Sequence, residues 1–588
     1  MIDQLIRRAR DSRFHRQGPV RPSRRGSVQV GPGGLRIELS SAVVGDAGVE
    51  FGGRVSLFEP FPGPTPLPAA AMALRLGGRA FPVGQGTWVQ GDGSRREFSF
   101  HVTIPLDQVP EGIWPITLRM PVLGREVTFD LWPSDGIMRA GRRRRAGDAW
   151  VQVRPGHGTM LILRAPAGGI GARVRWDARQ LAADVAYSLR PRRPGSFLAD
   201  MVRTYQVRHV WREWILRQLT WPLRLGGPIW LVGERTDTAQ DNGRAFFRYL
   251  RTQHPRRRAY YVIRRDAPNR EKVLPFGNVV WHGGLRHRLL ALHADVLVGS
   301  HNLDRYLLPT EWGSRDHRLH LLWRIGSKRA YLKHGVLGVR TLAFELRKAG
   351  LDICVAVGPP EAEYIRSITG YTEQVRTTGL PRYDLLAPTP PKRVVVLMPT
   401  WRQYLVPPRR EPGAPDSFTG SHYEAFFREL LTAPRLHAAL ERHDYTLEFY
   451  PHYNIDRFYR GMEPPHPRIR LSSFKQREVK DALIDCGLFI TDWSSVVFDA
   501  AYLGRAVIHA PFDEAEYLWG HYGQGWMTFD TLGFGPVARD VDQLLGHIER
   551  YLATGCEREP LYTERAATVF SHRDQACCQR VDEAILAL

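Results

Sequence analysis

The sequence has no run of about 18 apolar residues, the length that a membrane-spanning helix requires. Its first residues, MIDQLIRRARDSRF, contain no apolar core followed by a cleavage site. We therefore expect neither a spanning helix nor a secretory signal, and we expect a cytoplasmic protein. Cysteine is scarce as well: the five cysteines show no metal-ligand spacing, and Cys354 and Cys486 lie in apolar contexts. The cysteines are expected to be reduced and structural.

The sequence also lacks a G-x-G-x-x-G fingerprint and a GxxxxGK[ST] loop, which disfavours dinucleotide-dependent redox enzymes and P-loop NTPases. Positive charge, by contrast, is abundant. The 82 Lys and Arg residues against 60 Asp and Glu give a formal net charge of +22. Such a surplus indicates an anionic partner, whether nucleic acid, an anionic membrane face or a polyphosphate product. Part of the arginine excess also fits a GC-rich coding bias, so charge alone does not identify the partner.

The pattern along the chain predicts a series of segments. Residues 1–26 are basic and unpatterned, which predicts a mobile tail. Residues 27–190 consist of short runs such as GLRIELSSAVV and EFSFHVTIPL between Gly and Pro turns, which predicts a β-sandwich-like accessory region for binding, docking or dimerisation. A basic amphipathic helix and linker is predicted for 191–227. Two Rossmann-like domains follow, at 228–385 and 386–588.

The fold class follows from two series of alternating strands and helices beyond residue 228. GPIWLVGER and ADVLVGSHN are strands of the first series, and KRVVVLMPT and LFITD are strands of the second. The series break near TGLPRYDLLAPTPPKR. An α/β protein with two facing doubly wound domains, preceded by an amino-terminal β-rich region, is predicted.

The segment 197–221 combines aromatic and basic residues at helical spacing. The apolar residues expected near one face are Phe197, Met201, Tyr205, Val210, Trp214, Ile215 and Leu219. The arginines expected on the more polar side are Arg203, Arg208, Arg212 and Arg217. Such a helix either lies in the interface of an anionic membrane or packs on the neighbouring domain, and both interpretations stay open at this stage.

An apolar strand at residues 488–491 ends in Thr-Asp-Trp-Ser-Ser before an amphipathic helix begins. Such turns gather backbone N–H groups and the positive end of a helix dipole at the carboxyl edge of a parallel sheet, where phosphorylated ligands bind. The alternative is that Asp492 or Ser494 serves only as the N-cap of the helix.

Other polar residues also fall at strand ends. His334 follows a strand in AYLKHGVLGVRT, His452 ends a strand in LEFYPHYN, and Thr400 and Arg402 follow a strand in MPTWR. A single histidine among the 21 is more often structural or on the surface. Two at strand ends on opposite sides of one predicted cleft favour a functional site.

Several motifs, taken in order and spacing together, make the chain resemble a known family. They are GERTDTAQDNGRAFFRYL, KHGVLGVR, TGLPRYD, MPTWR, PH and TDWSSVVFDAAYLGRAVIHAPFDEAEY. Over about residues 228–545 the chain resembles the CDP-glycerol glycerophosphotransferases, a family of teichoic-acid polymerases and primases. Many members carry Trp-His-Gly-Thr-Pro-Leu-Lys where this chain has KHGVLGV, which keeps the His-Gly pair. The resemblance implies a glycosyltransferase-B-like fold, a CDP-activated polyol phosphate donor, no metal or other cofactor for the chemistry, and an enzyme resting on the membrane that holds its acceptor. It also implies that 228–385 is the acceptor-side domain and that 386–588 is the CDP-donor-binding domain.

The resemblance also implies roles for individual residues. His334 would accept the proton of the acceptor hydroxyl as it attacks the β-phosphorus of the donor. His452 and Arg402 would stabilise charge on the transferred phosphoryl group or on the CMP leaving group. The Ser494 and Ser495 hydroxyls would hold the donor pyrophosphate. The full set of expected donor-binding residues is Arg382, Thr400, Arg402, Thr491, Asp492, Ser494, Ser495 and Asp499.

The expected function is transfer of a polyol phosphate, with glycerol phosphate favoured, from a CDP donor to a hydroxyl of a membrane-linked acceptor. The product would be a teichoic-acid-like or capsular polymer, with CMP released. Expected partners are the CDP-polyol, a lipid-linked polymer acceptor and an anionic membrane surface contacted by residues 197–221, on the inner face of the cell membrane; nucleic acid is not expected, and a homo-oligomer stays open. Two alternatives remain: a nucleotide-sugar-dependent glycosyltransferase of the same fold, and a non-catalytic protein that binds anionic polymers.

Overall fold

The computed structural model describes most of the chain from residue 27 onward. The described ranges are 27–30, 33–44, 48–58, 72–83, 88–90, 95–122, 125–131, 144–156, 159–168, parts of 171–179, 208–313, 321–322, 325–337, 349–402 without 370 and 388, 404–406, 417–473, 477–520 and 526–588. The predicted basic tail at 1–26 and the first part of the predicted amphipathic helix, 197–207, lie outside these ranges.

The amino-terminal region forms two antiparallel sheets. The first has the order β1-β2-β3-β7-β6, with β1 (Ser27–Val30), β2 (Gly33–Val44), β3 (Gly48–Phe58), β7 (Arg95–Pro105) and β6 (Trp88–Gln90). The second has the order β10-β11-β12-β8-β4-β5, with β10 (Arg144–Ala146), β11 (Ala149–Gly156), β12 (Thr159–Pro166), β8 (Gly112–Val122), β4 (Ala73–Leu76) and β5 (Arg79–Pro82), and β9 (Arg125–Asp130) pairs with β8. One apolar core lies between them, since Phe51 and Phe98 of the first sheet and Leu118 and Ile162 of the second belong to the same cluster. The alternating pattern of the sequence therefore does correspond to strands with one buried face.

The first α/β domain is built on a parallel sheet with the order β15-β14-β13-β16-β17-β18-β19. Its strands are β13 (Ile229–Gly233), β14 (Arg258–Ile263), β15 (Val279–Trp281), β16 (Ala294–Gly299), β17 (Lys328–Tyr331), β18 (Ile353–Val355) and β19 (Val375–Arg376). Its helices are α6 (Asn242–Gln253), α7 (Leu285–Leu292), α8 (Leu303–Leu307) and α12 (Pro359–Thr369). Successive residues of β13 enter different cores: Trp230 and Val232 pack with α6, whereas Ile229 and Leu231 pack with α7 and α8. This is why the strand reads as a continuous apolar run.

The second α/β domain has a parallel sheet with the order β22-β21-β20-β23-β24. The strands are β20 (Val394–Leu397), β21 (Thr446–Phe449), β22 (Ile469–Leu471), β23 (Leu488–Thr491) and β24 (Ala506–His509). The helices are α13 (His422–Thr432), α14 (Pro434–Arg442), α15 (Asp456–Tyr459), α16 (Val479–Asp485), α17 (Val497–Tyr502), α18 (Glu514–Gly520), α19 (Phe529–Leu532), α20 (Val541–Ala553) and α21 (Pro560–Val569). The chain runs from β20 to β21 on one side and reaches β23 on the other, so the strand order reverses at β20. Ligands of such sheets bind at the carboxyl ends around this switch point.

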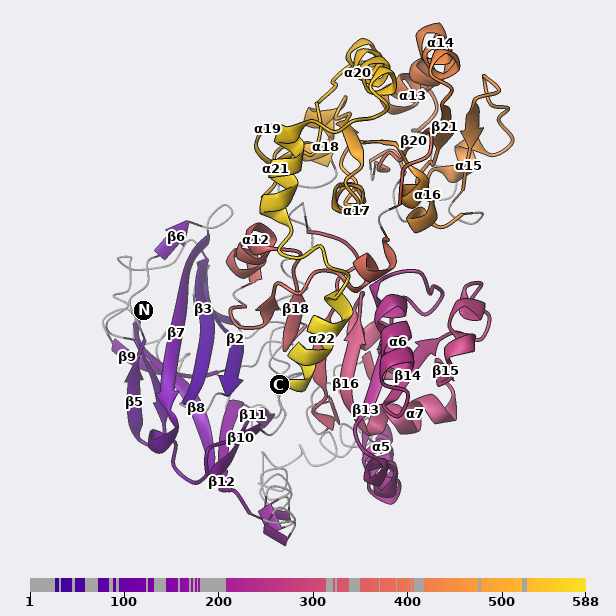
Figure 1. The fold of residues 1–588 in the computed structure, drawn as a ribbon. Helices are drawn as coiled ribbons and strands as arrows, with labels where there is room; N and C mark the ends of the chain where they lie inside the picture. Colours follow the sequence, from indigo (N-terminus) through magenta and orange to yellow (C-terminus); the bar gives the residue numbers. More distant parts are fainter. Residues whose placement is uncertain are drawn as a thin grey trace.

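Two segments join the α/β domains. The 3-10 turn η9 (Pro381–Leu385) leads out of the first domain, and the last helix, α22 (Cys577–Leu586), returns to pack on α6, η9 and β18. Figure 1 shows α22, in yellow, lying against the first domain. The Asp384 carboxylate accepts the backbone N–H groups of Cys577 and Cys578, each at 2.8 Å, and so caps α22. Although the sequence assigns 386–588 to the second domain, this helix contacts the first.

The predicted fold class is confirmed: two parallel α/β sheets follow an antiparallel β-rich region. Figure 1 shows the β-rich region, in indigo and violet, beside the first α/β domain, and the second α/β domain beyond the first. The cysteines named in the sequence analysis are free and buried.

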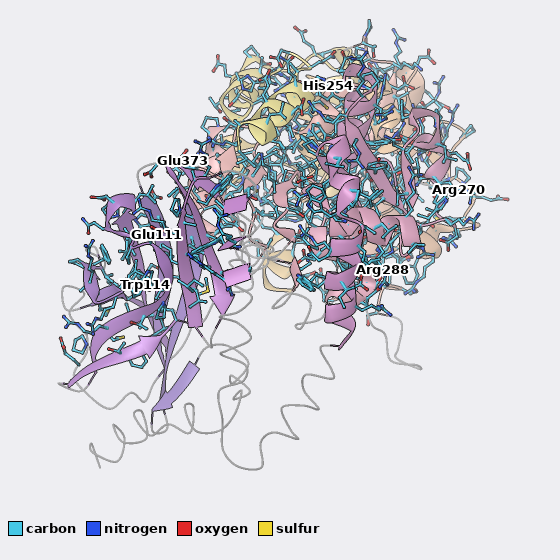
Figure 2. The ribbon with its side chains drawn as sticks, turned by 90° about the horizontal axis from the view of Figure 1, so that it is seen from below. Glu111, Trp114, His254, Arg270, Arg288 and Glu373 are labelled. Atoms are coloured by element: carbon cyan, nitrogen blue, oxygen red, sulfur yellow. The ribbon has the colours of Figure 1, made fainter. Side chains whose placement is uncertain are left out.

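Helix α5 (Arg208–Leu219) and the 3-10 turn η3 (Trp221–Gly226) precede the first α/β domain and dock onto it. Arg217 Nε donates to the Leu292 carbonyl at 2.8 Å, and Arg288, labelled in Figure 2, donates to the buried Glu213 carboxylate. Arg217 was expected on the polar face, but its guanidinium faces the domain. The large apolar side chains left exposed on the other side are Ile215 (49%), Leu219 (75%), Trp221 (49%) and Leu225 (73%). No helix in the described part of the chain is long and apolar enough to cross a membrane.

Candidate active site

Polar residues gather where the carboxyl ends of the two parallel sheets meet. In the first domain, strands β13, β16 and β17 lie side by side and run in the same direction. The loops after these strands carry Asp241, His301 and His334, whose ligand atoms all lie within 4.8 Å of one another. The second domain contributes Ser495, which lies directly against the loop that carries His334.

His334 is exposed and oriented by a buried carboxylate. Its Nδ1 lies 2.6 Å from Oδ2 of Asp241, and 71% of the His334 side chain is accessible against 7% of Asp241. In the neutral ring, an Nδ1–H that donates to Asp241 leaves Nε2 as the proton acceptor. The negative charge of Asp241 raises the pKa of His334 above 6.5. This arrangement suits a general base whose conjugate acid is stabilised by its neighbour.

Asp241 is itself held on several sides. It is the N-cap of α6, where its Oδ1 accepts the Asn242 N–H at 2.8 Å, and the same oxygen accepts Nη1 of Arg382 at 2.9 Å. Burial on its own would raise the pKa of Asp241, but the charges of His334 and Arg382 outweigh that effect and lower it. Asp241 is therefore an anion at neutral pH.

The loop that carries Asp241 is tightly constrained. The buried Glu234 carboxylate accepts the Asp241 N–H at 2.8 Å and the Arg244 N–H at 2.9 Å. An ideal Cβ at Gly243 would lie 2.3 Å from the carbonyl oxygen of Gly233, so the first turn of α6 approaches the end of β13 more closely than any side chain would allow. The GERTDTAQDNG motif thus fixes the position of the carboxylate.

The loop after β17 is fixed in the same manner. Lys333 has a positive φ of 58° and its ammonium pairs with Glu361, and both side chains are completely buried. Glu361 also accepts the N–H groups of Leu337 at 2.7 Å and Val357 at 2.9 Å, and the Lys333 carbonyl accepts Nδ2 of Asn242 at 2.9 Å. Lys333 therefore anchors the loop, and His334 is the exposed member of the pair.

The KHG and TDWSS motifs contact each other across the domain boundary. An ideal Cβ at Gly335 would lie 2.6 Å from Oγ of Ser495, so only glycine leaves room for this serine. Nε1 of Trp526 in the second domain donates to the Leu337 carbonyl at 2.6 Å. The two strand-end motifs that the sequence placed in different domains therefore lie side by side.

The TDWSS turn precedes helix α17, whose N-cap is Val496 and has no side-chain capping hydrogen bond, so neither Asp492 nor Ser494 is the N-cap. Ser494 Oγ accepts the Val496 N–H at 3.3 Å within the turn. The hydroxyl of Thr491 donates to the Met398 carbonyl at 2.6 Å. Helix α17 is only six residues long and begins after this turn. Ser495 faces Gly335 in the loop that carries His334.

Arg402 lies in a buried ion network rather than in the open cleft. Its Nη2 donates to Asp492 Oδ2 at 2.8 Å, and its Nε and Nη2 donate to the two oxygens of Asp513 at 2.6 and 2.7 Å. Asp492 Oδ1 accepts the Thr400 N–H at 2.8 Å. Burial opposes the charge of Arg402, but the two carboxylates outweigh it and raise the pKa of the guanidinium. This ion network holds the ends of β20 and β23 together. Sequence reasoning did not predict that Asp513 belongs to the network.

Arg382 and Asp499 form a second paired unit. Nε and Nη2 of Arg382 donate to the two Asp499 oxygens at 2.6 and 2.7 Å, while Nη1 donates to Asp241. Arg382 therefore joins a carboxylate of the first domain to one of the second. A donor-binding role for Arg382 and Asp499 stays a prediction, as do the roles assigned to Arg402 and Asp492.

His452 lies at the carboxyl edge of the second sheet, after β21. Its ring stacks on Trp401 with centroids 5.9 Å apart and is tilted by 36° to the ring of Tyr453 with centroids 4.1 Å apart. Its Nδ1 accepts the Asn454 N–H at 3.3 Å. Its predicted role in catalysis also stays a prediction.

Sequence reasoning missed His301, which follows β16. Its ring centroid lies 4.7 Å from that of His334. Burial, together with the charge of His334, lowers the pKa of His301 to about 4, so this ring is neutral at pH 7. With Asp241 the two histidines have the spacing of metal ligands, but Asp241 already pairs with His334 and Arg382. The same rule that selected His334, a polar residue directly after an apolar strand, would have selected His301 in ADVLVGSHN.

Comparison with known proteins agrees with the motifs. The family model for CDP-glycerol:poly(glycerophosphate) glycerophosphotransferase matches residues 217–587. The minor teichoic acid biosynthesis protein GgaB of Bacillus subtilis (strain 168) is 25% identical over 373 residues, which are 61% of this chain and 40% of that protein. The chain thus spans less than half the length of this relative.

Two solved structures resemble the chain more distantly. A structure of the wall teichoic acid polymerase TagF has a TM-score of 0.45 at 16% identity and covers 66% of this chain and 96% of that chain. A structure of CalG4, the calicheamicin glycosyltransferase, has a TM-score of 0.31 at 14% identity and covers 61% of this chain and 99% of that chain. The fold assignment rests on the sheets described above.

The matched residues 217–587 contain both α/β sheets and every motif that carries the resemblance. They make up more than half of the 588 residues. The protein therefore belongs to the CDP-glycerol:poly(glycerophosphate) glycerophosphotransferase family.

Proposed function

We propose that this protein transfers glycerol phosphate from CDP-glycerol to a terminal hydroxyl of a membrane-linked polymer, and releases CMP. The observation that carries the proposal is the dyad of His334 and Asp241, with Nδ1 and Oδ2 2.6 Å apart. The His334 ring is open to solvent, and the next residue, Gly335, lies against Ser495 of the TDWSS turn. A base beside a turn of that kind is what an attack by a hydroxyl on a bound pyrophosphate requires.

The chemistry balances on the residues of the site. The acceptor oxygen forms a bond to the β-phosphorus while the bond from that phosphorus to the bridging oxygen breaks, and CMP leaves with the electron pair. The acceptor proton passes to Nε2 of His334, and Asp241 stabilises the imidazolium that results. His301, neutral beside His334, adds no repelling charge when the proton arrives.

The donor pyrophosphate is assigned to the turn of the second domain. Ser494 and Ser495 are half-buried at the carboxyl edge of β23, and Ser495 lies against Gly335 of the His334 loop. The position of this turn on the ends of β20 and β23 is held by the hydrogen bonds of Asp492 with Arg402 and with the Thr400 N–H. Their contribution to donor binding is then through the position of the turn, since the Arg402 guanidinium is already occupied.

Membrane contact is assigned to α5 and η3, on the face turned away from the domain. Four large apolar side chains lie exposed within residues 215–225, next to Arg212, whose side chain is 68% accessible. Apolar side chains at headgroup depth beside a cation suit an anionic bilayer surface. Such contact would place the site near a lipid-linked acceptor.

The proposal is tested by incubating the protein with CDP-glycerol, CDP-ribitol and a panel of nucleotide sugars, together with a lipid-linked hydroxyl acceptor. Thermal stabilisation by a CDP-polyol, release of CMP and a phosphate-containing product are the expected results. A phosphate-free glycosidic product from a nucleotide sugar would establish the glycosyltransferase alternative. Steeply salt-dependent binding to anionic polymers without any CDP-ligand stabilisation would establish the non-catalytic one.

A further inference from the structure

The ring of His301 lies beside the proposed base and takes no part in the dyad. It follows β16, and its centroid lies 4.7 Å from that of His334, with the two rings tilted by 41°. A nitrogen of each histidine and an oxygen of Asp241 lie within 4.8 Å of one another. On another side Tyr306 stands edge-on to His301, with centroids 5.8 Å apart. A substrate atom bound at His334 therefore also lies near the ring of His301.

The hydroxyl of Ser300 determines which nitrogen of His301 carries the proton. Ser300 is completely buried, and its Oγ lies 3.1 Å from Nδ1 of His301. In the described part of the chain this nitrogen is the only hydrogen-bond partner of that hydroxyl. If Nδ1 were the donor, the hydroxyl hydrogen of Ser300 would be buried without an acceptor, which is costly. Ser300 therefore donates to Nδ1, and the neutral ring of His301 carries its hydrogen on Nε2.

The groups around His301 keep the ring neutral. Burial is the main reason that its pKa falls to about 4, and the charges of His334 and Arg235 lower it further. The carboxylates of Asp241 and Asp237 act in the opposite direction without outweighing these effects. At pH 7 the ring therefore offers an N–H donor that carries no positive charge.

The two neighbouring rings thus offer opposite hydrogen-bonding groups. His334 presents Nε2 as an acceptor because its Nδ1–H faces Asp241, whereas His301 presents Nε2–H as a donor. Among the residues that the structure describes, no protein atom accepts a hydrogen bond from Nε2 of His301. A hydroxyl that attacks phosphorus needs an acceptor for its proton, and the oxygens of the phosphoryl group need donors as charge develops on them. The pair of rings meets both needs.

We propose that His301 is a second catalytic residue, whose Nε2–H donates to a non-bridging oxygen of the phosphoryl group as that group passes to the acceptor hydroxyl at His334. The inference rests on the proposed function, because it takes the attack on the β-phosphorus to occur at His334. The acceptor oxygen bonds to phosphorus, the bond to the bridging oxygen breaks, and CMP leaves with the electron pair. The acceptor proton passes to His334, while His301 keeps its own proton throughout. A neutral donor stabilises the phosphoryl oxygen without weakening the base beside it.

The test combines His301→Phe with two CDP-glycerol analogues, the separated diastereomers in which sulfur replaces one non-bridging oxygen of the β-phosphate. With CDP-glycerol itself, loss of one preorganised donor is expected to lower kcat by about 10²- to 10³-fold and to change the KM values little. Sulfur is a weak hydrogen-bond acceptor, so the wild type should transfer one diastereomer more slowly than the other. The ratio of the two rates is expected to fall in His301→Phe.

Two further variants keep a polar group or the ring in place. His301→Gln retains an amide N–H and is expected to recover part of the kcat that His301→Phe loses. Ser300→Ala keeps the imidazole but removes the hydroxyl that holds the proton on Nε2. It is expected to lower the ratio between the diastereomers while the ring remains. A thermal melt of each variant verifies that it is folded.

His282→Phe is the matched control. His282 follows β15 of the same sheet, and its ring also lies beside a second histidine, His287, with centroids 5.1 Å apart and a tilt of 40°. Its Nε2 already has a partner in the Leu308 carbonyl at 3.1 Å. This variant should keep the wild-type kcat and the wild-type ratio between the two diastereomers.

The outcomes separate this inference from the proposed function. If the wild type releases CMP from CDP-glycerol but His301→Phe keeps its kcat or its ratio between the diastereomers, only the inference is overturned. Nitrogen NMR of the histidine rings that showed the hydrogen of His301 on Nδ1 would overturn it as well. CMP release that EDTA abolishes and Zn²⁺ restores would assign both histidines and Asp241 to a metal ion and exclude the donor role. If the wild type releases no CMP, the proposed function itself fails and the inference with it.

Discussion

The Asp241→Asn substitution is the sharpest test of the dyad. It keeps the size of the side chain but removes the charge that raises the pKa of His334. Asn can also present its amide N–H₂ to Nδ1, which favours the tautomer with the proton on Nε2, where the acceptor proton has to go. Loss of a correctly oriented base costs about 10²- to 10⁴-fold in turnover. We expect kcat to fall within that range.

The pH profile gives a second, independent readout. The base works unprotonated, so kcat/KM rises with pH through the pKa of His334. Because Asp241 raises that pKa, its removal lowers it, and the acid limb of the profile is expected to move to lower pH while the plateau falls. The assay is CMP release against pH for wild type and variant.

Asp499→Asn is the control for the loss of a carboxylate that pairs with Arg382. It also removes a carboxylate partner of Arg382, but it does not contact His334. The turnover of Asp499→Asn can fall without affecting the test. The acid limb of its pH profile of kcat/KM is expected to stay at the wild-type position. An Asp241→Asn enzyme with an unmoved acid limb and an unchanged plateau would refute the assignment of Asp241 and His334 as the base dyad.

Further predictions follow from the same contacts. His334→Ala is expected to reduce transfer below about a tenth of the wild-type rate with an unchanged melting temperature, since the exposed ring fills no core cavity; CMP release and a thermal melt check both. Gly335→Ala is expected to lower both stability and turnover because its Cβ would meet Ser495 Oγ at 2.6 Å, and adding Ser495→Gly should recover stability if that clash is the cause. Leu219→Gln with Leu225→Gln is expected to reduce co-sedimentation with anionic vesicles, and equal sedimentation of variant and wild type would place any membrane contact elsewhere.

The sequence was sufficient for the architecture and for part of the site. Buried parallel strands read as apolar runs, as β13 and β23 do, and the carboxyl end of each run marks the edge where ligands bind. That rule found His334 and the TDWSS turn, which the structure places in contact through Gly335 and Ser495. Applied to every strand, the rule would also have found His301.

Partners distant in sequence could not be predicted in the same way. Arg402 looked like a free cation at a strand end, but Asp513, 111 residues later, occupies its guanidinium. A helical wheel placed Arg217 on the polar face, but its guanidinium donates a hydrogen bond to the carbonyl of Leu292, 75 residues later, and therefore points toward the domain. A pattern of residue types gives the face of an element, whereas the partner across that face is decided by tertiary packing.

The motifs that carry the family resemblance are spread along the chain because they form one connected structure. Arg382 of TGLPRYD donates to Asp241 of the DTAQDN loop, to the carbonyl of His334 and to Asp499, which follows TDWSS. Asn242, next to Asp241, donates to the Lys333 carbonyl and accepts the Arg382 N–H at 2.9 Å. The orientation of the proposed base thus depends on residues from both domains. A substitution in any one of these motifs is expected to shift the position of His334 more than it disturbs the packing of either sheet's core.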